Sequence, residues 1–221
     1  MKLLALETAN EQCSVSLIDD SQTLFFQHDA RAKAQTQTIL PMIEQGFKTT
    51  QISVSDLTAI AFSRGPGSFS GVRINAAVTQ ALAWSNDLPV IPVSTLQALA
   101  QAAYREQGLD QVTAVIDARM QEVYIASFKL DDQQIMLAED EEKLLSYSDA
   151  AQYRQYTLIG SGAILVDAQA TEYKSIAASA EDIATIARQY ALKENWVSAE
   201  LALPVYLRDD AWKKIADQKK Q

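Results

Sequence analysis

The sequence predicts an α/β protein with two lobes that are built from two copies of one unit, the second copy being reduced. Short apolar segments and helical segments follow each other in the order strand, strand, strand, helix, strand, helix. After residue 107 a similar order recurs, as strand–turn–strand and then strand–glycine turn–helix. The predicted first lobe covers residues 1–106, and the second lobe, with a C-terminal tail, covers residues 107–221.

Three strands open the first lobe. Residues 3–6 are a short apolar run that ends at Glu7, and residues 13–18 alternate between apolar and polar side chains. A turn then leads into a third strand at residues 23–26. Two hairpins are therefore expected before the first helix.

The first helix is predicted through Ile39, Ile43 and Phe47, because these apolar residues recur at a spacing of four. Pro41 lies inside this pattern and removes one backbone donor. The helix is therefore expected either to begin near residue 40 or to kink there.

The rest of the first lobe alternates strands with helices. Strands are predicted at residues 57–62 and 90–93, and helices at 70–84 and 95–104. The first of these strands runs into a glycine-rich turn at residues 64–68. Alanines make the following helix favourable and permit close packing against it.

In the second lobe, residues 112–117 form an apolar strand that ends in an acid, as residues 3–7 do. A hairpin leads to an alternating strand at 123–130, and residues 157–159 run into the turn Gly160-Ser161-Gly162. A last helix is predicted at 180–192. An acidic and polar stretch stands where the first lobe has its first helix, so this lobe looks shortened.

Composition limits the possible partners. The 221 residues include 28 acidic and 19 basic ones, a net charge of −9. Because nucleic-acid affinity comes mostly from Lys and Arg on phosphates, the chain is not expected to bind RNA or DNA alone. Two charge clusters are read as solvated surface; a basic tail that touches a polyanion held by another subunit is the alternative. The acidic cluster comprises Asp131, Asp132, Glu139, Asp140, Glu141 and Glu142, and the basic tail Arg208, Lys213, Lys214, Lys219 and Lys220.

No apolar run is long enough for a membrane span, and the N-terminus lacks the features of a signal peptide. The lone Cys13 cannot form an internal disulfide, which fits a reducing compartment. We therefore expect a cytoplasmic protein without membrane contact. The single histidine, His28, next to Asp29, is expected at the surface. Neither a catalytic residue nor a metal site is predicted from these two residues.

The strongest local signal is the glycine turn before the second helix. Converging backbone amides at a helix N-terminus can bind an anion, and the loop after the first strand could form the opposite wall. The alternatives are a tight structural turn and a polar hairpin loop. The candidate nucleotide or phosphate residues are Glu7, Thr8, Asn10, Gly65, Gly67 and Ser68.

A second turn, at residues 117–121, carries opposite charges. Asp117 can accept from the amides of the turn and Arg119 can pair with a carboxylate. A role in closing the groove between the lobes is the functional alternative.

Four segments together resemble the bacterial TsaB (YeaZ) family, over almost the whole chain. They are residues 4–9, 64–73, 117–124 and 204–208. The resemblance implies an actin-like (ASKHA, ribonuclease H-like) fold. It also implies a non-catalytic subunit of the tRNA threonylcarbamoyltransferase complex, which forms N6-threonylcarbamoyladenosine (t6A) at adenosine 37 of tRNAs reading codons that begin with A.

Within that complex the resemblance implies a heterodimer with the catalytic paralogue TsaD, which the TsaE ATPase joins, and contact with tRNA only through the complex. TsaD carries a metal-binding pair of histidines in its first helix, whereas the corresponding residues 32–37 here contain none. Many relatives have aspartate in place of Glu7, so a magnesium role for this longer side chain is in doubt. The chain is expected to have no cofactor of its own, except weakly bound ATP or ADP at the subunit interface.

The resemblance places the pairing surface on the first two helices, which correspond to about residues 35–48 and 70–84. The second contributes a strip of small residues that either faces the partner or packs under the chain's own first helix. A homodimer through the same surface is expected when the partner is absent. The candidate partner-binding residues are Thr36, Ile39, Leu40, Ile43, Val72, Ala76, Thr79 and Ala83. Two other functions stay open, an ATP-dependent small-molecule kinase of the same fold and a peptidase.

Overall fold

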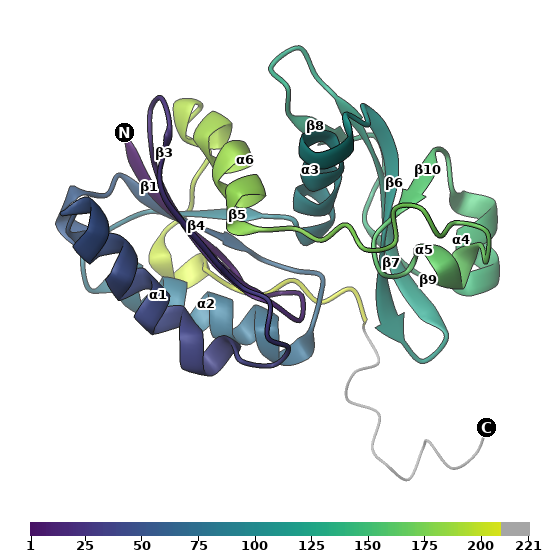
Figure 1. Ribbon diagram of the computed structural model, residues 1–221, viewed down its shortest axis with the longest axis horizontal. Helices are drawn as coiled ribbons and strands as arrows, with labels where there is room; N and C mark the ends of the chain where they lie inside the picture. The colour runs from purple at the N-terminus through teal and green to yellow at the C-terminus, as the bar shows by residue number, and fades with distance from the viewer. Residues whose placement is uncertain (209–221) are drawn as a thin grey trace, which may run out of the picture.

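The protein consists of two lobes that lie side by side, each built on one β-sheet (Figure 1). The structure, a computed structural model, describes residues 1–208. The lysines of the predicted basic tail, Lys213, Lys214, Lys219 and Lys220, lie outside the described residues.

The first sheet has the strand order β3-β2-β1-β4-β5. Its central strand β1 pairs with β2 antiparallel and with β4 parallel. Leu3 to Leu6 are fully buried, because β1 is covered by helices on both faces. The edge strand β3 is partly exposed and extends to Asp29, beyond the predicted end at residue 26. The strands are β1 (Lys2–Glu7), β2 (Cys13–Asp19), β3 (Thr23–Asp29), β4 (Ala59–Ser63) and β5 (Val90–Val93).

The second sheet has the order β10-β6-β7-β8, and β9 also pairs with β7. Here β6 pairs antiparallel with β7 and parallel with β10, as β1 does with β2 and β4. The predicted duplication is therefore confirmed, and with it the actin-like arrangement that the resemblance implies. The strands are β6 (Gln111–Arg119), β7 (Glu122–Leu130), β8 (Met136–Ala138), β9 (Lys143–Ser146) and β10 (Thr157–Ile159).

The second copy is reduced, as predicted. Among the described residues its sheet has no counterpart of β5 beyond β10. The short elements β8, β9 and α4 (Tyr147–Tyr153) follow β7, where the first copy has the long helix α1 (Gln35–Thr50). After the glycine turn at residues 160–162 comes only the short α5 (Ala163–Val166).

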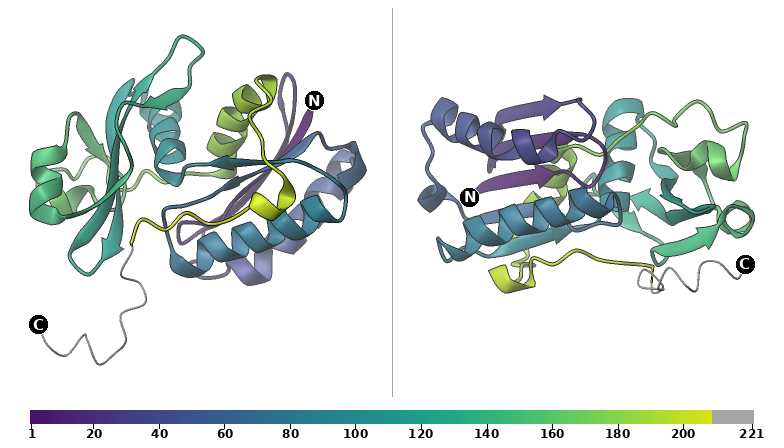
Figure 2. Two further views of the ribbon diagram at one scale, coloured as in Figure 1. Left: turned by 180° about the vertical axis from the view of Figure 1, so that it is seen from behind. Right: turned by 90° about the horizontal axis from the view of Figure 1, so that it is seen from below.

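Helices α1 and α2 (Phe69–Trp84) cover one face of the first sheet, and α6 (Ala180–Leu192) covers the other (Figures 1 and 2). Helix α3 (Thr95–Gln107) packs against the second sheet, whose opposite face is covered by α4 and α5. Helix α6 thus comes from the second half of the chain but packs on the first sheet. Because α3 and α6 also contact each other, one apolar core runs through both lobes.

Helix α1 begins at Gln35 and continues through Pro41 to Thr50, so the expected start near residue 40 is wrong. Pro41 is exposed, and the buried face of the helix, which includes Ile39 and Ile43, keeps its packing against the sheet. This packing outweighs the loss of one backbone hydrogen bond. Two 3-10 helices, η1 (Val54–Asp56) and η2 (Ala199–Leu201), complete the described part.

None of the helices described between residues 1 and 208 has the length and apolar character that a membrane crossing requires.

Candidate functional site

The loop after β1 and the glycine turn before α2 lie directly against each other. The Ser68 amide donates to the Ala9 carbonyl oxygen at 2.6 Å, and the Thr8 hydroxyl donates to the Gly71 carbonyl oxygen at 2.7 Å. A Cβ atom at Gly71 would overlap the Thr8 carbonyl oxygen, and one at Gly67 would overlap that of Ala9. Glycine is therefore required at both positions by close approach of two backbones.

Glu7, at the end of β1, is buried beneath this contact and is only 1% exposed. Its Oε1 accepts from the amides of Ala9 at 2.5 Å and Asn10 at 3.3 Å, whereas Oε2 has no hydrogen-bond partner. Desolvation raises the pKa of Glu7 to about 7, and the nearby Ser63 hydroxyl offsets only part of this effect. The carboxyl group is thus partly protonated near neutral pH, which makes it a poor magnesium ligand.

Asn75 links α2 to the ends of the two central strands, and the sequence reasoning missed it. Its Nδ2 donates to the carbonyl oxygens of Leu6 and Ser63, each at 3.1 Å, and lies 2.7 Å from the Ser63 hydroxyl. The side chain is fully buried, and its Oδ1 has no partner. An asparagine in the middle of an alanine-rich helix was the available signal, because such a residue is unfavourable unless it is hydrogen-bonded.

The candidate phosphate residues are brought together, but most of their side-chain polar groups, with Oε2 of Glu7 as an exception, form hydrogen bonds within the chain. Asn10 donates from Nδ2 to the Ala178 carbonyl oxygen and accepts from the Gln12 amide, both at 2.8 Å. Ser68 caps the N-terminus of α2, and the Gly65 carbonyl oxygen accepts from the amide at the start of α3. These contacts favour the structural-turn interpretation, and nucleotide binding stays a prediction.

The strip on α2 that was expected to be outward faces the protein interior. Val72, Ala76, Thr79 and Ala83 are at most 6% exposed, and Ala76 and Ala83 pack into the core between α2 and the first sheet. The interpretation of this strip as an exposed face is therefore wrong. The strip packs within the chain, but mainly against the sheet and not under the first helix alone. On α1, Ile39 and Ile43 are also buried, whereas Thr36 and Leu40 are exposed.

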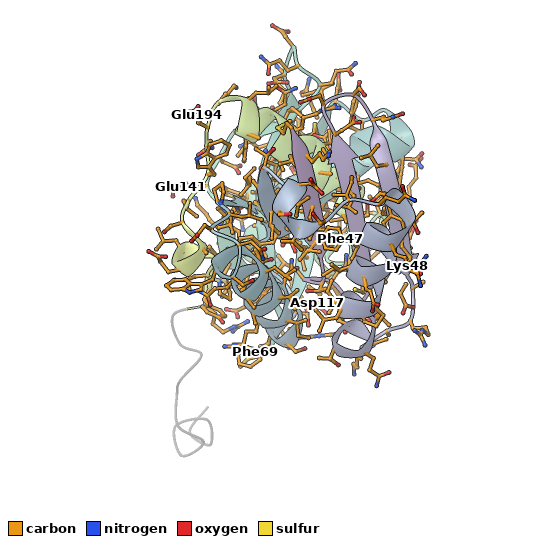
Figure 3. The ribbon with its side chains drawn as sticks, turned by 90° about the vertical axis from the view of Figure 1, so that its left-hand side faces the viewer. Phe47, Lys48, Phe69, Asp117, Glu141 and Glu194 are labelled. Carbon is orange, nitrogen blue, oxygen red and sulfur yellow. The ribbon has the colours of Figure 1, made fainter. Side chains whose placement is uncertain are left out.

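The outward side of the helix pair carries other small and apolar residues. Ala77 and Ala81 are exposed and Ile74 is half-buried, while Leu40 on α1 is 56% exposed. Helices α1 and α2 lie next to each other; Figure 3 shows α1, with Phe47 and Lys48, beside α2, which begins at Phe69. We call Thr36, Leu40, Ile74, Ala77 and Ala81 the outward helix face.

The C-terminal segment ties the first lobe to the second. The Val205 amide donates to the Arg64 carbonyl oxygen at 2.8 Å, and Arg64 itself forms an ion pair with Glu142 at 3.1 Å. Arg208 pairs with Glu122 and donates to a backbone oxygen at the end of β6. Three of the four segments that carry the family resemblance therefore meet at the lobe junction.

The turn after β6 behaves as its charges predict. Asp117 accepts from the Arg119 amide at 2.8 Å and pairs with its guanidinium at 3.0 Å. Arg119 also lies 3.7 Å from Glu11 of the first lobe, and both side chains are mostly exposed. An exposed pair of this kind contributes little stability, so it does not by itself hold the lobes together.

An aromatic and cationic cluster lies near this junction. The Arg73 guanidinium is 3.2 Å from the centroid of the Phe69 ring and 5.1 Å from that of Tyr206. Phe69 is 65% exposed and Tyr206 is 50% exposed, although both are large and apolar. Exposed aromatic residues combined with arginine are typical of the energetically important parts of protein interfaces.

His28 lies on the exposed strand β3, where its Nε2 is 2.8 Å from Oε1 of Gln12, so the prediction of a surface histidine is confirmed. Cys13 is buried, and burial raises the pKa of its thiol to about 11, the opposite of what a nucleophile needs. Among residues 1–208 no group of three or more His, Cys, Asp or Glu side chains is arranged to hold a metal ion.

Comparison with known proteins places this geometry in a family. Residues 29–213 match the family model described as TsaD: tRNA N6-adenosine threonylcarbamoyltransferase. The chain is 38% identical to the tRNA threonylcarbamoyladenosine biosynthesis protein TsaB of Escherichia coli K12, over 97% of this chain and 98% of the relative. A tRNA N6-adenosine threonylcarbamoyltransferase of Streptococcus equi is 29% identical over 48% of this chain and 36% of that protein.

Solved structures agree with the sequence relatives. The structure described as YeaZ from Pseudomonas aeruginosa matches with a TM-score of 0.85 and 37% identity, over 93% of this chain and 99% of that one. Sequence and structure thus agree over nearly the full length of the described lobes. The chain belongs to the TsaB (YeaZ) family.

Proposed function

We propose that the chain is a subunit in the biosynthesis of t6A in tRNA, which supports the catalytic paralogue TsaD and performs no group transfer itself. The names of its relatives support the process. The outward helix face supports the accessory role, because Leu40, Ala77 and Ala81 leave apolar surface uncovered in the isolated chain. In this proposal TsaD docks there and is held in its active arrangement, a population shift rather than a chemical step.

Reconstitution tests the role. The purified chain alone is expected to transfer no threonylcarbamoyl group to tRNA, and adding it to TsaD, TsaE and the adenylate-forming enzyme is expected to restore modification. The measurement is t6A content of the tRNA by mass spectrometry of nucleosides. Modification by the isolated chain, or full modification without it, would overturn the proposal.

The docking surface is tested by placing a charge on it. Ala81→Arg would bury an unpaired guanidinium in the interface, at a cost of about 3 kcal/mol, or roughly a hundredfold in the dissociation constant for TsaD. Ala151→Arg is the matched control, since Ala151 is an exposed helical alanine on α4 in the other lobe. Ala76 is unsuitable, because it is only 6% exposed and a charge there would test folding. Equal affinities of the two variants for TsaD would refute this surface.

The same surface is proposed to mediate a homodimer when TsaD is absent. Sedimentation of the free chain is then expected to show self-association that Ala81→Arg removes and Ala151→Arg retains. TsaD and a second copy would compete for one face, so adding TsaD is expected to dissociate the homodimer.

TsaE is proposed to contact the cluster of Phe69, Arg73 and Tyr206 near the lobe junction. The support is the exposure of both aromatic rings beside an arginine. Tyr206→Ala is expected to weaken recruitment of TsaE by roughly tenfold or more while leaving TsaD binding unchanged, as measured by pull-down from purified components. Unchanged recruitment of TsaE would remove the cluster from the proposal.

Contact with tRNA is proposed to occur only through the assembled complex, since the chain carries a net charge of −9. The complex is proposed to act in the cytoplasm. Any ATP or ADP is proposed to bind weakly at the boundary with TsaD. Calorimetry is expected to detect nucleotide binding to the heterodimer but not to the free chain, because Thr8, Asn10 and Ser68 already bond within it. Heat from the free chain that Gly67→Val abolishes would favour the small-molecule kinase alternative instead.

A further inference from the structure

A pocket of about 440 Å³ opens at the C-terminal end of α2, between the start of β5 and the segment at 196–200. Its volume falls in the range of pockets that bind small organic ligands. The residues that line it include Trp84 and Trp196, together with Leu88 and Pro89. Trp84 is 64% exposed, which is unusual for so large an apolar side chain.

The walls of this pocket are fixed by backbone hydrogen bonds. Val90 and Val197 form an isolated β-bridge, with each amide donating to the other carbonyl oxygen at 2.9 Å. Gln80 on α2 donates from Nε2 to the Glu200 carbonyl oxygen at 3.2 Å. The pocket is therefore a formed feature of the fold, so little ordering is needed when a ligand enters it.

The charged groups in the lining are both acidic. Asp87 and Glu200 line the pocket, and no Lys, Arg or His side chain does so among the described residues. Neither carboxylate forms an ion pair with another residue of the described part. A lining that combines two tryptophans with two acidic residues, neither of them in an ion pair, disfavours an anion and matches an organic cation.

We propose that this pocket binds an arginine side chain that a partner protein presents on an exposed peptide segment. A guanidinium is planar, stacks on indole faces, and donates in pairs to a carboxylate, which an ammonium group cannot do in the same way. The chain's own tail beyond residue 208 contains lysines but no arginine. The pocket lies at the C-terminal end of α2, beside η2. Trp84 is on the same side of α2 as Ala77 and Ala81, which precede it by seven and three residues. The test below uses the free chain, so its outcome does not depend on TsaD docking.

The test uses the full chain and the peptide Gly-Arg-Gly, with Gly-citrulline-Gly and Gly-Lys-Gly as probes of charge and shape. Indole N–H signals in proton–nitrogen NMR spectra are assigned with Trp84→Phe and Trp196→Phe. Both signals are expected to shift when Gly-Arg-Gly is added at roughly 10 mM, a concentration that suits the weak affinity of a single side chain. The shifts are expected to be smaller with Gly-Lys-Gly and absent with Gly-citrulline-Gly. No shift with the arginine peptide, or equal shifts with citrulline, would overturn the proposal.

Variants that remove the two negative charges distinguish binding in the pocket from nonspecific attraction of a cation to an acidic protein. Asp87→Asn is tolerated, because asparagine readily adopts the left-handed backbone conformation of this residue (φ 51°). Combined with Glu200→Gln, it is expected to weaken Gly-Arg-Gly binding roughly tenfold. Asp132→Asn, at an exposed acid in the other lobe, is the control and is expected to change nothing. An equal loss in the control would refute a specific site.

The chain's own tail is the competing occupant, and a variant ending at residue 208 decides between the two. Unchanged indole signals and unchanged Gly-Arg-Gly affinity in this variant support the proposal. Movement of both signals to new positions, with tighter peptide binding, would mean that the tail fills the pocket and would overturn it.

Discussion

Replacing Glu7 by glutamine is expected to remove a pH dependence of stability that the buried carboxyl group creates. The pKa of Glu7 is raised from 4.5 to about 7, mainly by desolvation. The folded state therefore binds the proton more tightly than the unfolded state. The stabilisation from this group is fully present below pH 4.5 and is lost as pH rises through 7. At 1.36 kcal/mol for each unit of pKa, the loss amounts to about 3 kcal/mol.

Glutamine suits the site, because its Oε1 can accept from the Ala9 and Asn10 amides while its amide nitrogen replaces the unpaired Oε2. It cannot ionise. The stability of Glu7→Gln relative to the original chain is therefore expected to rise by about 2.5 kcal/mol between pH 5 and pH 8.

The assay is urea unfolding of both proteins at several pH values, since groups shared by the two chains cancel in the difference. Asp132→Asn, at an exposed acid, is the control and is expected to show a difference that does not vary with pH. If the difference between Glu7→Gln and the original chain stays constant across this range, the carboxyl group is not buried as described and the reasoning fails.

Three further predictions concern local contacts. Gly71→Ala is expected to destabilise the chain by about 3 kcal/mol or more in urea unfolding, because its Cβ atom would overlap a backbone oxygen. The control Gly108→Ala has open space around it and should cost about 1 kcal/mol, because of its positive φ. Equal costs for the two variants would refute the close approach. Asp182→Asn is expected to lower the free energy of unfolding by about 2 kcal/mol, because it weakens the ion pair of the buried Asp182 with Arg105 and changes the cap of α6. Glu106→Gln removes a more exposed partner of the same arginine and is expected to cost less than about 0.5 kcal/mol. His28→Ala is expected to leave both stability and t6A formation unchanged within about 0.5 kcal/mol; loss of activity in a stable variant would contradict its surface role.

Much of the fold could be predicted because the central strands are apolar throughout. The runs at residues 3–6 and 59–62 are buried by helices on both faces of the sheet, and such runs identify strands without tertiary information. The crossing of α3 and α6 between the lobes could not be predicted in this way. Both helices are rich in buried alanine, so their sequences indicate close packing but not which sheet they pack on.

At the site, the sequence identified which segments meet but not which hydrogen bonds their polar groups form. The glycine turn indicated either an anion site or a tight structural turn, and in the structure Gly67 and Gly71 lie against the chain's own backbone at Ala9 and Thr8. Ser63 lies close to Glu7 and is hydrogen-bonded to Asn75 of α2, and these residues, distant in sequence, come together only when α2 packs on the sheet. Local pattern therefore predicted a polar loop where tertiary packing produces a desolvated acid.

The error on α2 has a physical cause that bears on function. Most surface helices have one apolar face, so that periodicity reveals which side is buried. In α2, small and apolar residues occupy both the inward side, with Val72 and Ala76, and the outward side, with Ala77 and Ala81, so periodicity cannot distinguish them. A helix that is apolar all round is expected to be covered on both sides. The first sheet covers only the inward side, which is why we assign the outward side to a partner and place the charge of the docking test at Ala81 rather than Ala76.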